Sequence, residues 1–185
     1  MSALGQRLVK LSDRFYDRMR HRDAFAAARG EATAQGFGAL RGHKYCLLVS
    51  FRRSGEPVPT PVWFGLDDEG RLYVHTEADA GKIKRVRANP RVLLAPASVR
   101  GKPAGPLAEG TARVLAPEDN ARAERAIQAN YGLGRRLYEG MGGPLGVEMV
   151  YLEVTPATAT EAHDSAPSVS AGERASAEQG GAAPQ

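Results

Sequence analysis

The spacing of apolar residues divides this chain into segments with different expected structures. Near the start, apolar side chains recur every three or four positions, at Leu4, Leu8, Leu11, Phe15 and Met19. This spacing predicts an amphipathic helix. A weaker helical pattern covers residues 23–34, and several glycines follow it. We therefore expect residues 1–43 to form an N-terminal helical extension.

From Lys44 onward, the apolar residues form short runs and alternations instead. They predict six strands, over residues 45–51, 58–66, 71–76, 91–97, 109–115 and 147–154. Prolines at 57, 59 and 61 place the second strand at a sheet edge, because proline cannot donate a ladder hydrogen bond. Hairpin-linked short strands favour an antiparallel barrel over a parallel doubly wound sheet. The predicted fold class is therefore mainly β (α+β), with the barrel over residues 44–156.

Short helices are expected between these strands. One begins after Asp79, whose side chain is suited to cap it, and it turns Ile83 and Val86 inward. A second covers residues 117–130, with a proline in its first turn. A third, shorter helix is expected near residues 135–141.

The end of the chain has a different composition. Residues 157–185 are nearly all Ala, Gly, Ser, Glu, Pro and Gln, and Val169 is their only large aliphatic residue. Such a segment buries too little apolar surface to offset the entropy lost on ordering. We expect it to be a disordered tail.

Composition and charge narrow the function classes. The chain has 185 residues, 42% of them hydrophobic and 25% charged, which is typical of a soluble globular protein. It has one cysteine and no apolar run of membrane-spanning length or signal-peptide pattern, so a cytoplasmic protein without a membrane segment is expected. Residues 1–156 carry 24 Lys and Arg against 17 Asp and Glu, or +7. This surplus favours an anionic partner.

Most catalytic motifs are absent. The chain has no nucleophile elbow, phosphate-binding Walker loop, zinc-protease motif or dinucleotide fingerprint. Its four histidines are scattered without metal-ligand spacing, so no metal site is expected. Cys46 lies within an apolar run and is expected to be a core residue. Three side chains could act as proton donors, namely Tyr73, His75 and Tyr131. No motif distinguishes one of them, so the catalytic residue is unknown.

A strand that ends at Thr76 and a helix that starts near Ala80 form one candidate anion site. Helix N-termini present unpaired N–H groups and positive potential, which suit a phosphate. Lys82 lies in the first turn, where a cation opposes the helix dipole unless an anion binds there. The alternative interpretation is a solvated basic helix face with Asp79 offsetting its charge.

The edge strand provides a second candidate. It contains Thr60, Pro61, Val62 and Trp63, the last being the only tryptophan. Edge prolines leave carbonyl groups available to a ligand, but they are also a common protection against edge-to-edge pairing. Trp63 is equally consistent with an ordinary core aromatic.

Together these segments resemble a known family. Residues 44–156 resemble the flavin and deazaflavin split-barrel oxidoreductases of the pyridoxamine 5'-phosphate oxidase-like (PPOX) class. The similarity is greatest to the coenzyme F420-dependent oxidoreductases of actinobacteria. The segments that carry it are Pro59–Leu66, Gly70–Thr76, Gly81–Pro96, Arg100–Pro103, Glu109–Val114 and Tyr151–Pro156.

The resemblance implies a six-stranded split barrel that forms a homodimer, with the cofactor in a groove between the subunits. It implies that the strand at Thr60–Trp63 runs along the cofactor ring and that Thr76 and Lys82 hold the phosphate. A long anionic coenzyme tail would need a basic track. The candidates for that track are Lys84, Arg85, Arg87, Arg100 and Lys102.

Two departures from the family pattern affect the substrate. Pyridoxamine-phosphate oxidases carry Ser-Arg-Lys at the phosphate corner, whereas this chain has Ala80-Gly81-Lys82. They also start the ring-facing strand with arginine, where this chain has Thr60. Both departures count against pyridoxamine phosphate as a substrate.

The expected function is that of an F420-dependent oxidoreductase, which transfers a hydride between reduced F420 and an unsaturated small molecule. One alternative is an FMN-dependent oxidase or reductase on the same fold. Another is a non-enzymatic barrel that binds a flavin, haem or related tetrapyrrole. Nucleic acid is not an expected partner, because aromatic residues are only 6% of the chain and no basic–aromatic stacking platform is evident.

Overall fold

One antiparallel sheet organises the protein. The computed structural model describes residues 21–132 and 148–157, so the helices expected at 4–19 and 135–141 and the tail beyond Ala157 lie outside the described residues. The strands are β1 (Tyr45–Phe51), β2 (Pro57–Trp63), β3 (Gly65–Leu66), β4 (Leu72–Glu77), β5 (Arg91–Ala97), β6 (Ala108–Val114) and β7 (Met149–Pro156). The helices are α2 (Arg22–Ala27), α3 (Gly81–Ala88) and α4 (Asn120–Tyr131), with short 3-10 turns at Gly38–Leu40 and Pro117–Asp119.

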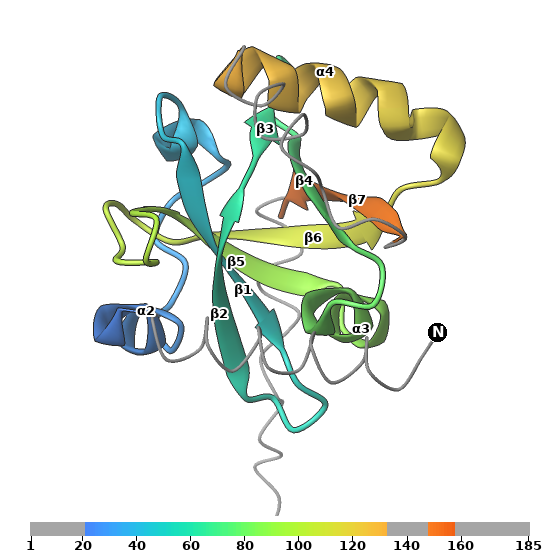
Figure 1. Cartoon of the computed structure of the whole chain (residues 1–185). Helices are drawn as coiled ribbons and strands as arrows, with labels where there is room; N and C mark the ends of the chain where they lie inside the picture. The colour runs from blue at the N-terminus through green and yellow to red at the C-terminus, as the bar shows by residue number, and fades with distance from the viewer. Residues whose placement is uncertain (1–20, 133–147, 158–185) are drawn as a thin grey trace, which may run out of the picture.

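The sheet curls into a split barrel (Figure 1). Its strand order is β2-β1-β5-β6-β7-β4-β3, and every neighbouring pair is antiparallel. β2 and β3 lie at opposite ends of this order but follow each other in the chain, separated only by Phe64. A single bent segment therefore joins the two edges of the sheet. This confirms the predicted mainly β, antiparallel split barrel.

The described residues form seven strands where six were predicted. The difference arises because the strand expected over 58–66 is interrupted at Phe64. The Phe64 N–H donates to the Tyr131 hydroxyl, 3.1 Å away, and the Phe64 carbonyl accepts from Asn130 Nδ2 at 2.9 Å. Side chains of α4 thus satisfy the backbone groups that a continuous strand would have used for pairing.

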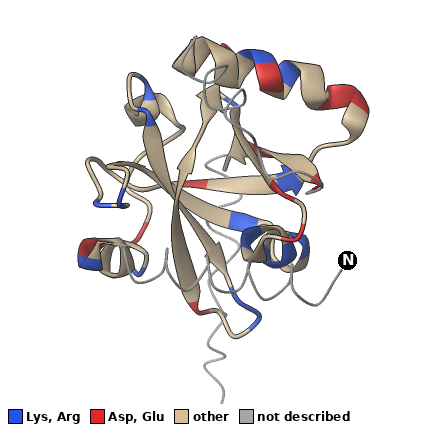
Figure 2. Cartoon of the chain, in the orientation of Figure 1, with Lys and Arg blue, Asp and Glu red and all other residues tan. Residues whose placement is uncertain are grey.

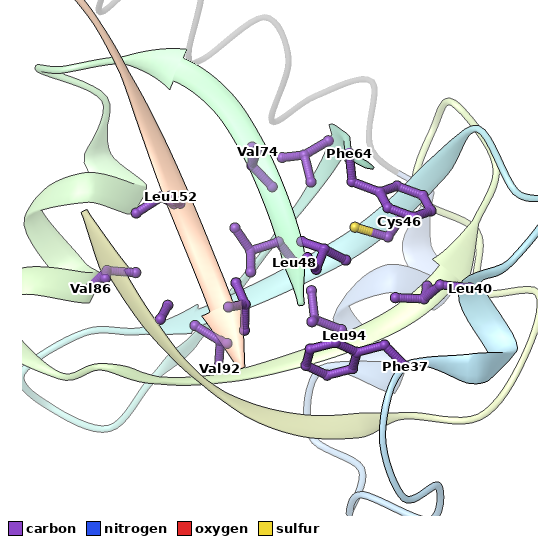
Figure 3. Packing of buried hydrophobic residues seen from close by; sticks show 14 of the residues in the cluster. Phe37, Leu40, Cys46, Leu48, Phe64, Val74, Val86, Val92, Leu94 and Leu152 are labelled. Atoms are coloured by element: carbon purple, nitrogen blue, oxygen red, sulfur yellow. The ribbon is translucent and has the colours of Figure 1, made fainter. Parts of the chain in front are cut away.

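The barrel interior is apolar. Residues of alternating parity on the strands point into it, as the sequence pattern predicted. Figure 3 shows Cys46 and Leu48 of β1 gathered there with Val74 of β4, Leu94 of β5 and Leu152 of β7. Cys46 is fully buried, which confirms the prediction of a core residue, and burial raises the pKa of its thiol.

The N-terminal part of the described chain covers the opposite face of β1 and β5. Ala24 and Ala28 pack with Leu47, Val49 and other apolar residues on this face. The helix α2 is shorter than the pattern over 23–34 predicted. The chain leaves the helix after Ala27, and the Gly30 N–H bonds back to the Ala27 carbonyl.

Residues between α2 and β1 also enter the fold. Phe37 and Leu40 are buried in the barrel interior (Figure 3). Ala34 forms an isolated bridge with Ala108 of β6. The range expected as a helical extension therefore contributes part of the barrel core.

α4 crosses β3 at very close range. A Cβ atom added to Gly65 would lie 2.3 Å from the backbone carbon of Ala126 and 2.3 Å from the backbone nitrogen of Ile127. Real Cβ atoms do not approach backbone atoms this closely, so only glycine permits the crossing. The apolar side of α4 then packs on Tyr73 and Leu115.

A polar network fastens α4 to the sheet. The buried Tyr73 donates from its hydroxyl to Asp67 at 3.0 Å and lies 3.2 Å from Glu153. Arg122 of α4 pairs with Asp67 at 2.9 Å, and Arg113 pairs with Glu153 at 2.7 Å. Burial acts to raise the pKa of Asp67, but hydrogen bonds from Arg71, Tyr73 and Arg122 outweigh it and lower the pKa.

Within the described ranges, none of the helices has the length and apolar character needed to cross a membrane.

We predict that Gly65→Ala lowers the free energy of unfolding by about 2 kcal/mol or more, because the added methyl group meets backbone atoms of α4. Urea unfolding would measure the change. Gly38→Ala is the matched control, since a Cβ there meets nothing within 4 Å. Equal stability of the two variants would contradict the close packing at Gly65.

We predict that Asp67→Asn destabilises the protein at neutral pH by about 1.5–3 kcal/mol, the usual value of a charge-assisted hydrogen bond. A lowered folded-state pKa means that the stabilisation is complete above the unfolded-state value near 4 and is lost as the pH falls below it. The stability gap between wild type and variant should therefore narrow in acid. Asp68→Asn, at an exposed neighbouring position, should leave the pH profile unchanged.

Candidate functional site

The expected phosphate corner brings Thr76 and Lys82 together. Thr76 lies near the end of β4 and is 7% exposed. It shares strand parity with Leu72 and Val74, which face the barrel interior. Lys82 is in the first turn of α3, and its Nζ donates to Thr76 Oγ1 at 2.6 Å. A buried hydroxyl thus fixes the position of this lysine.

The start of α3 has no acidic cap. Ala80 is the N-cap residue and makes no side-chain hydrogen bond, and the first turn contains no acidic residue. The expectation that Asp79 caps the helix is therefore wrong; the Asp79 side chain is exposed one position earlier. The helix begins instead where Ile83 and Val86 are inserted into the core. Its first turn contributes only positive charge, which is complementary to an anion.

Arg85 also reaches this corner. Its Nε donates to Ser50 Oγ of β1 at 2.8 Å, and Ser50 is fully buried. Its Nη1 lies 3.0 Å from where a Cβ on Gly81 would be, so the guanidinium turns back toward the start of the helix. Arg85 was predicted to belong to a basic track, and Ser50 was not among the predicted site residues. The signal available was one serine in the otherwise apolar strand 45–51, since a buried hydroxyl needs a hydrogen-bond partner.

The edge strand β2 runs past this corner. Ser50 pairs in register with Val58, and Leu48 pairs with Thr60. Thr60 is therefore about 7 Å along the strand from the residue opposite Ser50. Of the four residues expected along the cofactor ring, Thr60 and Val62 share the inward parity, while Pro61 and Trp63 share the outward one.

The prolines of β2 determine which backbone groups lie along the edge that faces away from β1. Proline cannot donate a hydrogen bond, so the residues of β2 that donate to β1 are the ones between the prolines. The backbone carbonyl groups of Pro59 and Pro61 therefore face away from β1. The edge away from β1 thus carries carbonyl acceptors without competing N–H donors at these positions, where Pro59 is buried and Pro61 is half-buried. Such an edge suits a planar ligand that carries N–H groups.

Trp63 lies at the far end of β2, in an aromatic cluster. Its ring stacks on Tyr131 of α4 at 5.1 Å between centroids and meets Tyr45 edge-on at 6.2 Å. Lys44 Nζ lies 5.5 Å from the centre of the Tyr131 ring. Trp63 therefore takes part in the contact between α4 and the sheet edge. Its role beside a cofactor ring stays a prediction.

The basic residues form two groups rather than one track. Lys84 and Arg87 are exposed on α3. Arg100 and Lys102 belong to the loop after β5, whereas α3 precedes β5, so the length of that strand separates the groups. Figure 2 shows them on opposite sides of the view. Within one chain, the structure does not bring the loop pair to the phosphate corner.

The three candidate proton donors make contacts away from the phosphate corner. Tyr73 and His75 lie on the outer face of β4, opposite to Thr76 in parity. Burial, followed by the neighbouring Asp67 and Glu153 carboxylates, raises the pKa of Tyr73. His75 stacks on Tyr151 at 4.6 Å. The Tyr131 hydroxyl donates to the Lys44 carbonyl and accepts from Phe64.

Other parts of the described chain are weaker candidates for a functional site. The described residues contain no group of three His, Cys, Asp or Glu side chains arranged to hold a metal ion. A hollow of about 520 Å³ lies between α4 and the turn at residues 67–69. Arg122 in that hollow pairs with Asp67 and Glu69, so its charges neutralise one another.

Comparison with solved structures finds several that are similar to this chain. The conserved hypothetical protein Rv2991 from Mycobacterium tuberculosis is 18% identical, with 70% of this chain and 87% of that chain covered and a TM-score of 0.50. The haem-storage protein HutZ from Vibrio cholerae is 13% identical, with 64% and 84% covered and a TM-score of 0.48. A protein described as an F420 reductase is 21% identical, with 68% and 97% covered and a TM-score of 0.43. No curated protein matches the chain.

The family assignment rests on a sequence profile. The profile described as pyridoxamine 5'-phosphate oxidase matches residues 33–163, which is well over half of the chain. The match includes the edge strand, the phosphate corner and the closing strand β7. The chain belongs to the pyridoxamine 5'-phosphate oxidase family.

Proposed function

We propose that the protein is an oxidoreductase that uses coenzyme F420 and reduces an unsaturated small molecule. The observation that carries this proposal is the phosphate corner, where Lys82 is fixed on the buried Thr76 at the uncapped start of α3. A binder of nucleic acid or a membrane surface would have no use for a lysine held by a buried hydroxyl beside an edge strand.

The residues present fit a phosphorylated, planar cofactor. Lys82 and the first turn of α3 suit the phosphate. The carbonyl edge of β2 at Pro59 and Pro61 suits the N–H groups of a flavin or deazaflavin ring. Lys84 and Arg87, exposed farther along α3, suit the carboxylates of a coenzyme tail.

The reduced coenzyme supplies the hydride when it is bound, and the chain supplies binding and orientation. Thr76 holds Lys82 in place, and β2 positions the ring against the sheet edge. No described tyrosine or histidine of the predicted donor set lies on the inward face of β4 beside Thr76, so we assign no proton donor.

FMN is the second candidate cofactor. The same lysine would serve its phosphate, and the fold is shared by proteins whose described roles differ, from F420 reduction to haem storage. Gly81 stands where pyridoxamine-phosphate oxidases have an arginine, and Thr60 stands where they begin the ring-facing strand with one. These two departures favour F420 over FMN.

Titration of the purified protein with F420 and with FMN tests the proposal. We predict that F420 binds more tightly and that Lys82→Ala weakens binding ten- to a hundredfold, because a charge-assisted hydrogen bond of about 1.5–3 kcal/mol is lost. Lys102→Ala removes the same charge from an exposed loop and shows the effect of a lysine on the outer track, away from the phosphate. Its effect should be much smaller and should fade with added salt.

Three outcomes would separate the alternatives. Tighter binding of FMN, with its visible absorption bands, would favour an FMN-dependent oxidase or reductase. Co-purified haem, with its Soret band, would favour a non-enzymatic role. Unchanged F420 and FMN affinity in Lys82→Ala would show that the phosphate assignment is wrong.

We also propose that the active form is a homodimer with a cofactor groove between the subunits. Within one chain, Arg100 and Lys102 lie far from α3, and a dimer would allow them to approach the groove from the other subunit. We predict that sedimentation of the cofactor-bound protein at micromolar concentration gives the mass of two chains. A monomer that still binds cofactor would contradict the dimer.

A further inference from the structure

We propose that residues 158–185, called here the acidic segment, dock on the exposed face of α3. The segment carries four acidic residues against one basic residue, or −3, namely Glu161, Asp164, Glu173 and Glu178 against Arg174. Residues 1–156 carry 24 Lys and Arg against 17 Asp and Glu. Charges of opposite sign on one chain attract each other, so the acidic segment has a partner within its own protein.

The exposed face of α3 carries two cations that are open to such a partner. Lys84 and Arg87 are three residues apart, so they lie on one side of the helix. Both are exposed, and neither makes a side-chain hydrogen bond or ion pair in the described ranges 21–132 and 148–157. The same holds for Arg53, in the turn between β1 and β2. The helix itself, Gly81–Ala88, contains no acidic residue that could compensate them.

The turn between β1 and β2 lies beside α3. Arg85 of α3 donates to Ser50 of β1 at 2.8 Å, and Arg53 follows Ser50 by three residues. Arg91, at the start of β5, lies 4.8 Å from the centre of the Phe51 ring. Figure 2 shows blue positions on α3, at the start of β5 and in this turn, in neighbouring parts of the molecule. The open cations of α3 and the turn therefore belong to one basic surface.

Strand β7 brings the acidic segment to this surface. Thr111 of β6 pairs with Arg91 on one side and with Thr155 of β7 on the other. Adjacent strands are about 4.8 Å apart, so Thr155 lies about 10 Å from Arg91. Arg91 itself follows the last residue of α3 by only three positions. Ala157 then donates from its N–H to the Glu109 carbonyl at 3.0 Å, and the acidic segment starts from this point.

The first two acidic residues of the segment have the reach that docking needs. An extended chain spans at most about 3.3–3.6 Å per residue. Glu161 is four residues after Ala157 and can therefore lie about 14 Å from it, and Asp164 about 25 Å. A short tether gives these carboxylates a high effective concentration near α3.

Other basic surfaces of the described chain are less suited. The loop with Arg100 and Lys102 follows the far end of the seven-residue β5, which places it about 20 Å beyond Arg91. In α2, Arg22 lies 3.7 Å from Asp23, so part of its charge is compensated. Charge and distance together therefore favour α3.

Docking of this kind is held by charge and is reversible. Val169 is the only large aliphatic residue of the acidic segment, so little apolar surface supports the contact. Exposed ion pairs are individually weak, and salt screens them. Lys84 and Arg87 are also the residues that the proposed function assigns to the carboxylates of a coenzyme tail. The docked segment then competes with the coenzyme for them; this competition rests on the proposed function, whereas the docking does not.

Paramagnetic relaxation measured by NMR on the 185-residue chain tests the docking. A nitroxide attached to Ser165→Cys reports what lies near the acidic segment, and Cys46 stays unlabelled because it is fully buried. We expect the amide signals of Lys84 and Arg87 to lose more intensity than that of Arg22 in α2. Salt of about 0.5 M should restore them, because it screens exposed charges.

Two charge-matched variants separate docking from a general attraction. Glu161→Gln with Asp164→Asn removes two charges close to β7, and we expect it to abolish most of the signal loss on α3. Glu173→Gln with Glu178→Gln removes the same charge farther along the segment and should leave most of it. An even loss over the whole surface, a stronger loss on α2 or in the loop at 100–102, or equal effects of the two variants would overturn the docking.

Titration with F420 at low salt tests the competition. We expect Glu161→Gln with Asp164→Asn to tighten F420 binding about two- to fivefold, and the difference to fade with added salt. Unchanged F420 affinity, with the signal loss on α3 confirmed, would show that the segment docks without competing. Failure of the wild-type chain to bind F420 would overturn the proposed function instead, and the relaxation measurement, which needs no ligand, would still decide whether the segment docks.

Discussion

The bend at Phe64 is the constraint on which the rest of the structure depends. A seven-residue edge strand would ordinarily continue straight, but both backbone groups of Phe64 are bound by side chains at the end of α4. The same side chains reach the chain just before β1, since Asn130 donates to the His43 carbonyl and Tyr131 to that of Lys44. One helix end thus holds both the bend after β2 and the start of β1, and the close crossing at Gly65 keeps that helix on the sheet.

The bend also determines where a ligand can bind. Because β2 pairs only with β1 along the sheet order, its other edge is left with the carbonyl groups of its prolines. β3 follows the bend and pairs with β4, which leads to the start of α3 (Figure 1). The phosphate corner and the carbonyl edge therefore belong to separate strands that are connected through the bend and β3. Rigid placement of this kind lowers the entropy that a ligand must lose on binding.

The apolar pattern was sufficient to predict the fold class because side chains on both faces of the sheet follow it. In the strand predicted over residues 71–76, Leu72 and Val74 alternate with more polar positions, and both lie in the buried cluster. The break at Phe64 was not predictable, since it depends on two polar side chains more than sixty residues away. The candidate site likewise contains contacts that are local in sequence and contacts that are not. Thr76 and Lys82 are near in sequence and are in contact, although their role toward a phosphate stays a prediction, whereas the contact between Arg85 and Ser50 spans two elements that no local pattern connects.

Two cations at the phosphate corner make hydrogen bonds to buried hydroxyl groups, and cations elsewhere fasten the elements of the fold together. Arg91, Arg113 and Arg122 each pair with a carboxylate, and these pairs fasten one element to another. At α3, Lys82 and Arg85 are oriented by hydroxyl groups of a threonine and a serine. Both hydroxyls lie on strands that are buried for reasons of packing, so the orientation is present before any ligand arrives. A substitution of either hydroxyl would therefore affect where a positive charge lies rather than how much charge is present.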